Sequence, residues 1–465
     1  MTPSLVLAVV FACLSGVTYG YDICVIAGAL KDMTEFFEDC SQELIVACMS
    51  IGVLVSRAAG WGLADKFGRI KSLILADLFI IASILATVFT SSTEVLLTAR
   101  FALGIGIGLA LLVGPTYLSE ISPNEYRGRL ITLHELSVCI GSFLGMAASL
   151  AFPSASWQIK LGVSAIPSLA QLAMTFALPE SPLWLIGKGF SERALVVRKK
   201  LGLKDEEVLV IPDMTQASVN GTQPPSPKPA RNLTELQLSP SSMGSLENLE
   251  FSSPEKSADS VKTWKFLFST YKVPLLVAVA VAVAGSASGF YAVQAFSVSL
   301  VLKFLPDWTE VGAARVILPI FGAAKVGGVF VCYFLIDLLG RRAVLIASLL
   351  LMAISNCLVL AAIGLEGARW VGVGGVGGIM FGWSLGVGSM MLLVANELLP
   401  TNLRAIGSSI ALSATSIVEV FYHLVFPSLL ENAPLVPFSL FLVYCVFAAL
   451  LTLKCVPETV ASSLH

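Results

Sequence analysis

Several charged side chains lie inside long apolar stretches of the sequence, where a charge needs a partner or a function. Asp22 and Arg100 are the clearest pair, with opposite signs in two different stretches. A charge at the centre of a membrane costs at least ~2.5–3.5 kcal/mol on the mildest scale, so we expect the two side chains to pair. Asp22 could also take up and release a proton if Arg100 moved away and returned. The alternative is a purely structural ion pair.

Other charged residues also lie within apolar stretches. Lys325 and Glu419 have opposite signs and could pair, and the carboxylate of Glu135 is expected to line an internal cavity, because intramembrane carboxylates are rarely idle. Arg57 and Asp77 lie nearer the ends of their stretches. We therefore expect these two side chains to reach toward water or to contact loops.

Histidine and cysteine do not form a recognisable reactive site. His134 precedes Glu135, and His423 lies one turn from Glu419, but an isolated histidine in a helix is more often a hydrogen-bonded packing residue. The nine cysteines are scattered, mostly in apolar stretches, without a C-x-x-C pair. We interpret them as apolar packing residues rather than metal ligands or disulfides. No metal site, catalytic residue or cofactor is predicted, and therefore no enzyme.

Three short motifs of the first half return in the second half in the same order. Asp-x-x-x-Arg recurs after 272 residues, Glu-x6-Arg after 277 and Pro-Glu-Ser/Thr after 278. The charged members of the first two motifs are Asp65, Arg69, Glu120 and Arg127, and then Asp337, Arg341, Glu397 and Arg404. These near-equal separations indicate two parallel repeats. We expect the eight residues to form a gate that closes one face of the molecule. The alternative is that the basic residues only set the topology.

Membrane-crossing helices must position these residues. Of 465 residues, 56% are hydrophobic and only 13% charged, half the charge of a soluble protein. This excludes a soluble enzyme and a disordered scaffold, and a net charge of -2 gives no basic surface for nucleic acid. A crossing helix needs about 20 apolar residues. Hydropathy predicts twelve such helices: 4–29, 43–64, 71–91, 95–118, 130–152, 158–178, 273–302, 311–338, 343–363, 370–398, 405–429 and 435–456.

The predicted fold is therefore an all-α membrane protein with two six-helix bundles, residues 1–178 and 272–456. Residues 179–271 form a loop between them, with a charged, helix-prone segment at 191–210 and a Pro- and Ser-rich stretch expected to be disordered. Residues 457–465 form a short tail. Basic residues gather in alternate loops, which places both termini and the long loop in the cytosol. The first helix lacks a basic leader and is expected to stay uncleaved.

At these motifs the chain resembles the sugar porter family of the major facilitator superfamily, which includes facilitative glucose transporters and bacterial proton-coupled relatives. The resemblance covers nearly the whole chain outside the loop. It rests on Gly20–Asp22, Asp65–Arg69, Arg100, Glu120–Gly128, Pro179–Pro182, Gly340–Arg342, Glu397–Arg404 and Pro457–Thr459. Glu135, where most members have Gln, and Lys325, where many have Asn, are similar to the branch of glucose transporter members ten and twelve.

The chain departs from this family in the second half of the sugar site. Gly285–Gly289 replaces the glutamine pair of the seventh helix, and Tyr291 replaces an asparagine. Leu392 stands at the tryptophan of the tenth helix, and Thr415 at an asparagine of the eleventh. The transport motifs are thus retained while much of the second half of the sugar site is replaced.

The resemblance implies a central sugar site. Amides and carboxylates bind sugar hydroxyls, and aromatic rings pack against the apolar sugar face. The candidates are Glu135, Tyr291, Gln294, Trp383 and Thr415. Tyr291 and Gln294 are three residues apart and share a helix face. The alternative is that these residues hold helices together or face lipid.

The resemblance further implies a transporter that moves a hexose or similar polyhydroxylated solute by alternating access. We expect facilitated diffusion. The alternatives are proton symport through Asp22, a sensor that signals through the long loop without transport, and an organic ion as the solute. The expected partners are the solute, the lipid bilayer and, in the symport alternative, protons, with no nucleic acid. We expect a monomer in the plasma membrane or an endomembrane.

Overall fold

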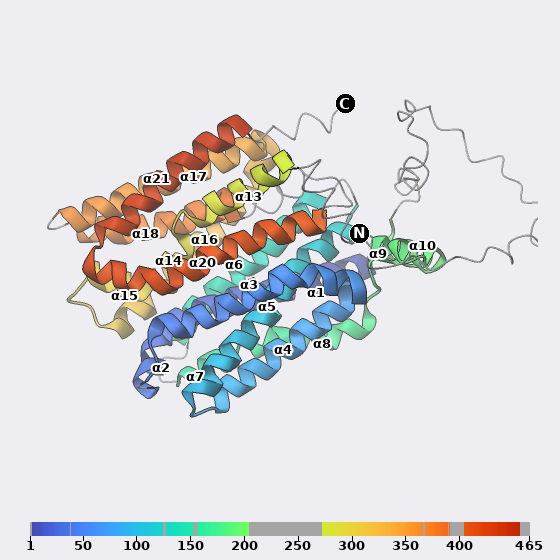
Figure 1. The fold of residues 1–465 in the computed structure, drawn as a ribbon, viewed down its shortest axis with the longest axis horizontal. Coiled ribbons are helices and arrows are strands. Elements are labelled where there is room, and N and C mark those ends of the chain that lie inside the picture. The colour runs from blue at the N-terminus through green and yellow to red at the C-terminus, as the bar shows by residue number, and fades with distance from the viewer. Residues whose placement is uncertain are drawn as a thin grey trace, which may run out of the picture. The chain divides into compact units, whose positions relative to one another are not determined.

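The computed structural model describes residues 2–37, 39–123, 127–151, 156–203, 272–365, 368–388, 390 and 404–455. They belong to one compact unit built from both halves of the chain (Figure 1). The stretch expected to be disordered and the short tail lie outside the described residues.

The first half begins with helix α1, whose start is fixed by its first residues. The Thr2 side chain accepts a hydrogen bond from the N–H of Leu5, and Pro3 occupies the first helical position. The elements of this half are α1 (Pro3–Val25), η1 (Ile26–Gly28), α2 (Leu30–Phe36), α3 (Gln42–Phe67), α4 (Arg69–Phe89), α5 (Thr93–Ile121), α6 (Arg127–Ala151), α7 (Trp157–Gly162), α8 (Ala165–Met174), η2 (Thr175–Ala177), α9 (Pro182–Gly187) and α10 (Ser191–Leu201).

The second half repeats long apolar helices. Its elements are α13 (Lys272–Ser286), α14 (Phe290–Ala295), α15 (Ser297–Phe304), α16 (Glu310–Leu339), α17 (Arg341–Gly364), α18 (Arg369–Gly382), the π-helical turn η6 (Trp383–Val387), α20 (Arg404–Asn432) and α21 (Leu435–Cys455). Within the described residues, eleven helices or helix runs are long and apolar enough to cross a membrane.

The seventh predicted crossing helix is not continuous. Residues 273–302 form α13, α14 and α15 instead of one helix. One break lies at Phe296, between α14 and α15. The other includes Gly289, between α13 and α14, whose φ of +91° favours glycine. A Cβ there would also lie 2.2 Å from the ring of Phe441, so any other residue would strain the backbone and collide. The prediction of an unbroken helix was wrong because hydropathy does not register this turn.

Helices of the same half pack closely on one another. In the first half, α1 lies against α6, and α3 and α4 lie against α5; in the second, α17 lies against α18 and α21. A Cβ on Gly20 would lie 1.9 Å from the carbonyl oxygen of Val138, so α1 and α6 approach as closely as only glycine permits.

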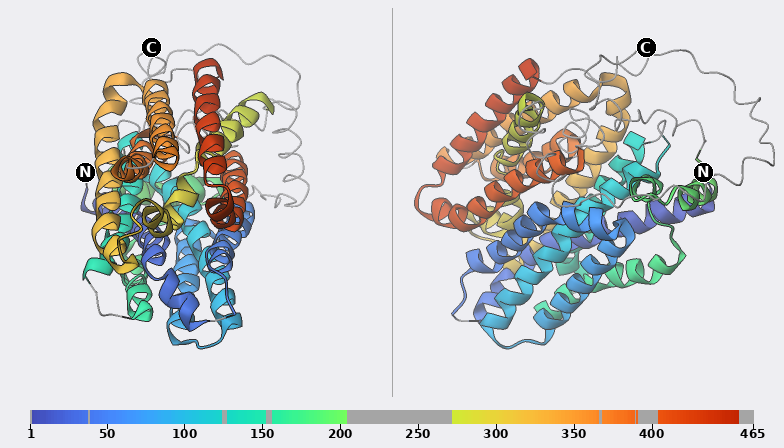
Figure 2. Two further views of the ribbon diagram at one scale, coloured as in Figure 1. Left: turned by 90° about the vertical axis from the view of Figure 1, so that its left-hand side faces the viewer. Right: turned by 45° about the vertical axis from the view of Figure 1, so that its right-hand side comes forward.

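Two helix pairs form the most extensive contacts between the halves. Helix α3 packs against α20, and α6 packs against α16, and both pairs meet where the differently coloured halves adjoin in Figure 1 and Figure 2. The repeat relates these contacts, because α3 and α6 are the second and fifth crossing helices of the first half, and α16 and α20 are their counterparts. The molecule therefore has two equivalent interfaces around its centre.

Part of the predicted helix-prone segment forms α10, which ends at Gly202 with a left-handed φ of +74°. The Thr2 hydroxyl donates to the carbonyl oxygen of Leu201 at 2.9 Å, so α10 is held against the beginning of α1. Leu201 and Leu203 pack into the same apolar cluster as Leu5.

Candidate functional site

A cavity of about 100 Å³ lies between the two halves, large enough for several water molecules. Both halves contribute to its wall. The described lining residues are Tyr19, Ile23, Arg57, Leu111, Pro115, Ile131, His134, Glu135 and Val138 from the first half, and Phe290, Tyr291, Gln294, Lys325, Trp383, Gly388 and Leu412 from the second.

Aromatic rings form one wall of this cavity. The ring of Phe290 stacks on Trp383 with centroids 4.3 Å apart and an interplanar angle of 3°. Tyr291 meets Trp383 edge-on at 5.2 Å. The break at Gly289 makes this arrangement possible, because it starts the short helix α14 that carries Phe290 and Tyr291 into the centre. The wall offers a flat apolar surface beside a phenolic hydroxyl.

Polar groups of both signs face the rings. Lys325 Nζ donates to Gln294 Oε1 at 2.9 Å and to Ser142 Oγ at 2.8 Å, and it lies 5.1 Å from the ring centroid of Phe290. Glu135 is half-buried and lines the same cavity. The structure thus brings together four of the five predicted solute-binding residues.

Thr415, the fifth, does not line the cavity. Its side chain is fully buried, and its hydroxyl donates to the carbonyl oxygen of Leu412 at 2.7 Å, within the same helix. A hydroxyl bonded in this way is not available to a solute in the cavity. Leu412, three residues earlier, faces the cavity in its place.

Glu419 pairs with Arg57 and not with Lys325. Arg57 Nη1 lies 3.9 Å from Glu419 Oε2 and donates to Ser416 Oγ at 2.7 Å. Arg57 is 4% exposed, so the expectation that it reaches water was wrong. Helix α3 extends to Phe67, ten residues beyond Arg57 and thus about 15 Å along the helix. The predicted helix ended at residue 64, which made Arg57 seem shallower than it is.

Ser50 on α3 and His423 on α20 extend the polar contacts of the Arg57–Glu419 pair. Ser50 Oγ lies 2.8 Å from His423 Nδ1 and 3.4 Å from Glu419 Oε1. His423 is therefore a hydrogen-bonded packing residue, as expected. His134 lies 3.4 Å from Ser15 Oγ through Nε2, and it also reaches the cavity. Tyr19, Arg57 and His134 are cavity residues that the sequence analysis did not identify.

The expected ion pair of Asp22 and Arg100 is present. Arg100 Nη1 donates to Asp22 Oδ2 at 3.3 Å between α1 and α5, and both side chains are 1% exposed. Neither residue is among the described residues that line the cavity. Both belong to the first half, so the pair links two helices of one bundle.

Asp77 is also buried, contrary to expectation. Its side chain is 1% exposed on α4, and no described residue donates a hydrogen bond to its Oδ2 atom. Helix α4 packs against both α5 and α8, so the side chain is enclosed although it lies only two turns from the helix start.

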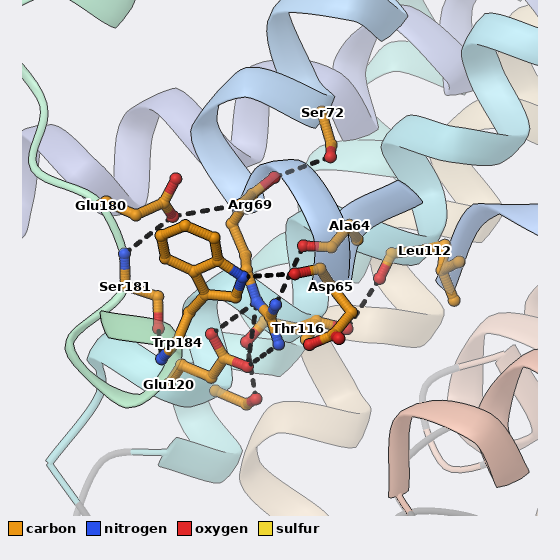
Figure 3. A network of polar contacts seen from close by, with 12 residues as sticks. Ala64, Asp65, Arg69, Ser72, Leu112, Thr116, Glu120, Glu180, Ser181 and Trp184 are labelled. Atoms are coloured by element: carbon orange, nitrogen blue, oxygen red, sulfur yellow. Dashed lines mark hydrogen bonds and ion pairs between the residues drawn. The ribbon is translucent and has the colours of Figure 1, made fainter. Parts of the chain in front are cut away.

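Two residues of the predicted gate, Arg69 and Glu120, belong to a compact network at one end of the first-half bundle (Figure 3). Arg69 binds the carboxylate of Glu120 through Nη2 at 2.6 Å and Nε at 2.9 Å, and its Nη1 donates to the carbonyl oxygen of Ala64 at 3.0 Å. Two parallel charge-assisted bonds give such a pair strength and a fixed geometry. Asp65 binds Lys188 Nζ at 3.1 Å, at an exposed position.

Glu180 joins this network although it was not predicted as a gate residue. Its carboxylate accepts hydrogen bonds from the N–H groups of Arg69 at 2.9 Å and Ile70 at 3.2 Å, at the start of α4. Burial raises the pKa of Glu180, while these N–H groups and Arg69 oppose that rise. Gly68, with φ +97°, makes room, since a Cβ there would lie 2.3 Å from Glu180 Oε2. The repeated Pro-Glu-Ser/Thr motif was the signal for this residue.

The other gate residues are described only in part. Arg341 is the first residue of α17, and it is half-buried. Glu397 lies outside the described residues. The side chains of Arg127, Asp337 and Arg404 also lie outside them, although their backbone positions are helical. The gate therefore stays a prediction in both halves, and its second half lies largely outside the described residues.

Comparison with known sequences identifies relatives along the whole chain. The glucose transporter GlcP of Staphylococcus epidermidis is 26% identical over 98% of this chain and 95% of its own. Plastidic glucose transporter 4 of Arabidopsis thaliana is 29% identical over 98% of this chain and 78% of its own. The probable inositol transporter 3 of Arabidopsis thaliana is 37% identical over 40% of this chain, and the match spans only a third of its length (33%).

Solved structures show the same fold. The proton:xylose symporter XylE, a major facilitator superfamily protein solved with 6-bromo-6-deoxy-D-glucose, superposes with a TM-score of 0.79. It is 21% identical, and the match covers 98% of this chain and 96% of that protein. This confirms the predicted all-α membrane fold. The sequence model of the sugar (and other) transporter family matches residues 8–465, and the chain therefore belongs to this family.

Proposed function

We propose that the protein is a membrane transporter that moves a hexose or a similar polyol by alternating access. The cavity between the halves carries this proposal, since it combines a carboxylate, an ammonium group, an amide and stacked rings. Hydroxyls of a solute can donate to Glu135 and accept from Lys325, while the apolar face of its ring packs on Trp383. A buried polar site of this kind discriminates against molecules without hydroxyls, because its own groups would be left unpaired.

Uptake into proteoliposomes tests the proposal. We expect wild-type protein to take up at least one labelled member of a panel of hexoses, pentoses and inositols, down its gradient. Glu135→Leu should reduce uptake at least about tenfold, the size of effect that follows from removing a charged hydrogen-bond partner. Thr415→Ala is the matched control, because its hydroxyl bonds within its own helix. No uptake of any sugar or polyol by the wild type would contradict the proposal.

Facilitated diffusion is the mode of transport that we propose, and proton symport is the second candidate. The Asp22–Arg100 pair favours neither by itself, since buried opposite charges pair in both cases. A symporter would accumulate solute in a pH gradient, and Asp22→Asn would abolish accumulation while retaining downhill exchange. A facilitator would show no accumulation in the wild type. Accumulation that Asp22→Asn abolishes would overturn our choice.

The proposed orientation places both termini and the Arg69–Glu120 network in the cytosol. Basic residues at the turn between α3 and α4 support it. An impermeant thiol reagent added outside cells should label a cysteine at exposed Ser91 and not one at exposed Lys66. The reverse pattern would invert the orientation. We further propose a monomer in the plasma membrane or an endomembrane. The similarity to members ten and twelve stays a prediction that rests on Glu135 and Lys325.

A further inference from the structure

The two interfaces between the halves each contain a buried cation that reaches across. At the interface of α3 and α20, Arg57 of the first half donates to Ser416 of the second at 2.7 Å. At the interface of α6 and α16, Lys325 of the second half donates to Ser142 of the first at 2.8 Å. Both cations line the central cavity. Each interface is thus bridged at the level of the candidate solute site.

The internal repeat relates these two bridges. Ser142 on α6 and Glu419 on α20 are 277 residues apart, the same separation as the repeated Glu-x6-Arg motifs. Arg57 and Lys325 lie on the equivalent helices α3 and α16, about one turn from the position that the 272-residue repeat would give. The two cations therefore lie at similar positions in the two repeats, and each reaches the helix of the opposite half that the repeat relates to the other's partner helix.

The bridges differ in charge. Arg57 has the carboxylate of Glu419 beside it, at 3.9 Å. Lys325 donates its two hydrogen bonds to the neutral oxygens of Ser142 and Gln294. The carboxylate of Glu135 lines the same cavity, but no described carboxylate lies within ion-pair distance of Lys325. An ammonium group has three N–H donors, so one donor of Lys325 is left for the cavity. Lys325 can therefore hold the first half, the second half and a solute at the same time.

We propose that Lys325 couples solute binding to contact between the halves, with Ser142 as its positioning residue in the first half. The proposal rests on the proposed transport function. Ser142 and Gln294 fix the ammonium group at the cavity wall when α6 and α16 are in contact. A solute hydroxyl that accepts a hydrogen bond from the third N–H of Lys325 then stabilises this arrangement. Separation of α6 and α16 breaks the bond to Ser142, and Lys325 is then no longer positioned for the solute. Arg57 has the carboxylate of Glu419 beside it when α3 and α20 are in contact, and so does not need the solute as a partner there.

Thermodynamic linkage gives the expected size and symmetry of the effect. If contact with Ser142 positions Lys325 for the solute, the solute must strengthen that contact by the same factor. Ser142→Ala removes one acceptor and no charge. We expect it to weaken solute binding about fivefold or more, the usual scale of such coupling. We also expect the two halves of the solute-free Ser142→Ala variant to be held together less tightly than those of the solute-free wild type.

Spin-label distances measured together with solute affinity test the proposal. One label pair replaces Lys66 and Leu338, and another replaces Ser91 and Leu365; all four residues are exposed and lie near helix ends of opposite halves. The accessible native cysteines are first replaced. In the wild type, saturating solute should narrow the distance distributions. In Ser142→Ala the solute-free distributions should broaden, and the solute should narrow them less.

Ser137→Ala is the matched control. Ser137 lies on the same helix and bonds the carbonyl oxygen of His134 within it, so its loss leaves the bridge intact. Lys325→Met, which keeps the length of the side chain without its donors, should match or exceed Ser142→Ala. If Ser142→Ala behaves like Ser137→Ala in both affinity and distances, the proposal is wrong. If the wild type binds no sugar or polyol, the proposed function fails. The solute-free distances then still decide whether the bridge holds the halves.

Discussion

Two buried ion pairs of this protein have different places in the architecture. Asp22 and Arg100 join α1 to α5 within the first half, with both side chains 1% exposed. Arg57 and Glu419 join α3 to α20 between the halves, with side chains 5% and 3% exposed. The first pair forms a hydrogen bond at 3.3 Å, whereas the second is separated by 3.9 Å and relies on serines around it.

The difference between the two pairs follows from how each is affected when the two halves move relative to each other. A pair within one bundle moves with that bundle and can stay intact when the halves rearrange. A pair between bundles must stretch or exchange partners in the same movement. Ser50 and Ser416 supply alternative partners to Glu419 and Arg57, which lowers the penalty when the two charges separate. We call Asp22–Arg100, within the first bundle, the inner pair, and Arg57–Glu419, between the bundles, the outer pair. We infer that the inner pair stabilises its bundle and that the outer pair responds to the relative position of the two halves.

The largest expected effect comes from breaking the inner pair. Arg100→Leu leaves Asp22 as an uncompensated buried charge, and breaking such a pair costs about 3–5 kcal/mol. The expected result is a marked loss of monodisperse protein and of thermal stability in detergent. The double variant Asp22→Asn with Arg100→Leu should recover most of the lost thermal stability, because no unpaired buried charge remains. A stable single variant would show that the inner pair is dispensable.

Breaking the outer pair should have a smaller effect on stability. Glu419→Gln keeps the volume and leaves Arg57 bonded to Ser416, so we expect a loss of about 1–3 kcal/mol. Arg57→Gln combined with Glu419→Gln should show a coupling energy well below that of the inner pair. A double-mutant cycle on thermal stability measures both. Equal coupling energies for the two pairs would show that a pair within one bundle and a pair between bundles do not differ in this protein.

The gate network should affect rate more than stability. Glu120→Gln retains a hydrogen bond to Arg69 but loses its charge, which weakens the network by about 1–2 kcal/mol. Because the network would stabilise the state closed on its side, transport should change severalfold while thermal stability stays near that of the wild type. Counterflow measurements in proteoliposomes provide the rate. Unchanged rates would leave these residues with a role in topology only.

The smallest effect is expected at the exposed pair of Lys188 and Asp65. Their side chains are 26% and 60% exposed, and such pairs contribute at most about 0.5–1 kcal/mol. Lys188→Ala should therefore leave thermal stability and transport within experimental error, with and without added salt. A large loss would mean that Trp184, which donates to the carbonyl oxygen of Asp65 at 2.8 Å, depends on Lys188 for its position.

Much of this architecture could be predicted because membranes restrict local sequence strongly. Long apolar stretches give the crossing helices, and repeated motifs give their division into two halves. The pairing of Asp22 with Arg100 also followed from the sequence, since two lone opposite charges at similar depth have few other partners. Family resemblance indicated Glu135, Tyr291, Gln294 and Trp383, which the fold brings to one cavity.

Tertiary structure alone decided which way each side chain points and what it meets. The depth of Arg57 was predicted wrongly because the hydropathy of the sequence made its helix too short. Glu419 had no firm predicted partner because several charged residues in apolar stretches could pair with it. Thr415 carries a suitable hydroxyl, but its bond to Leu412 withdraws it from the cavity. Helix rotation and helix contact select among such alternatives. Both depend on packing between residues that are hundreds of positions apart, which no local property of the sequence encodes.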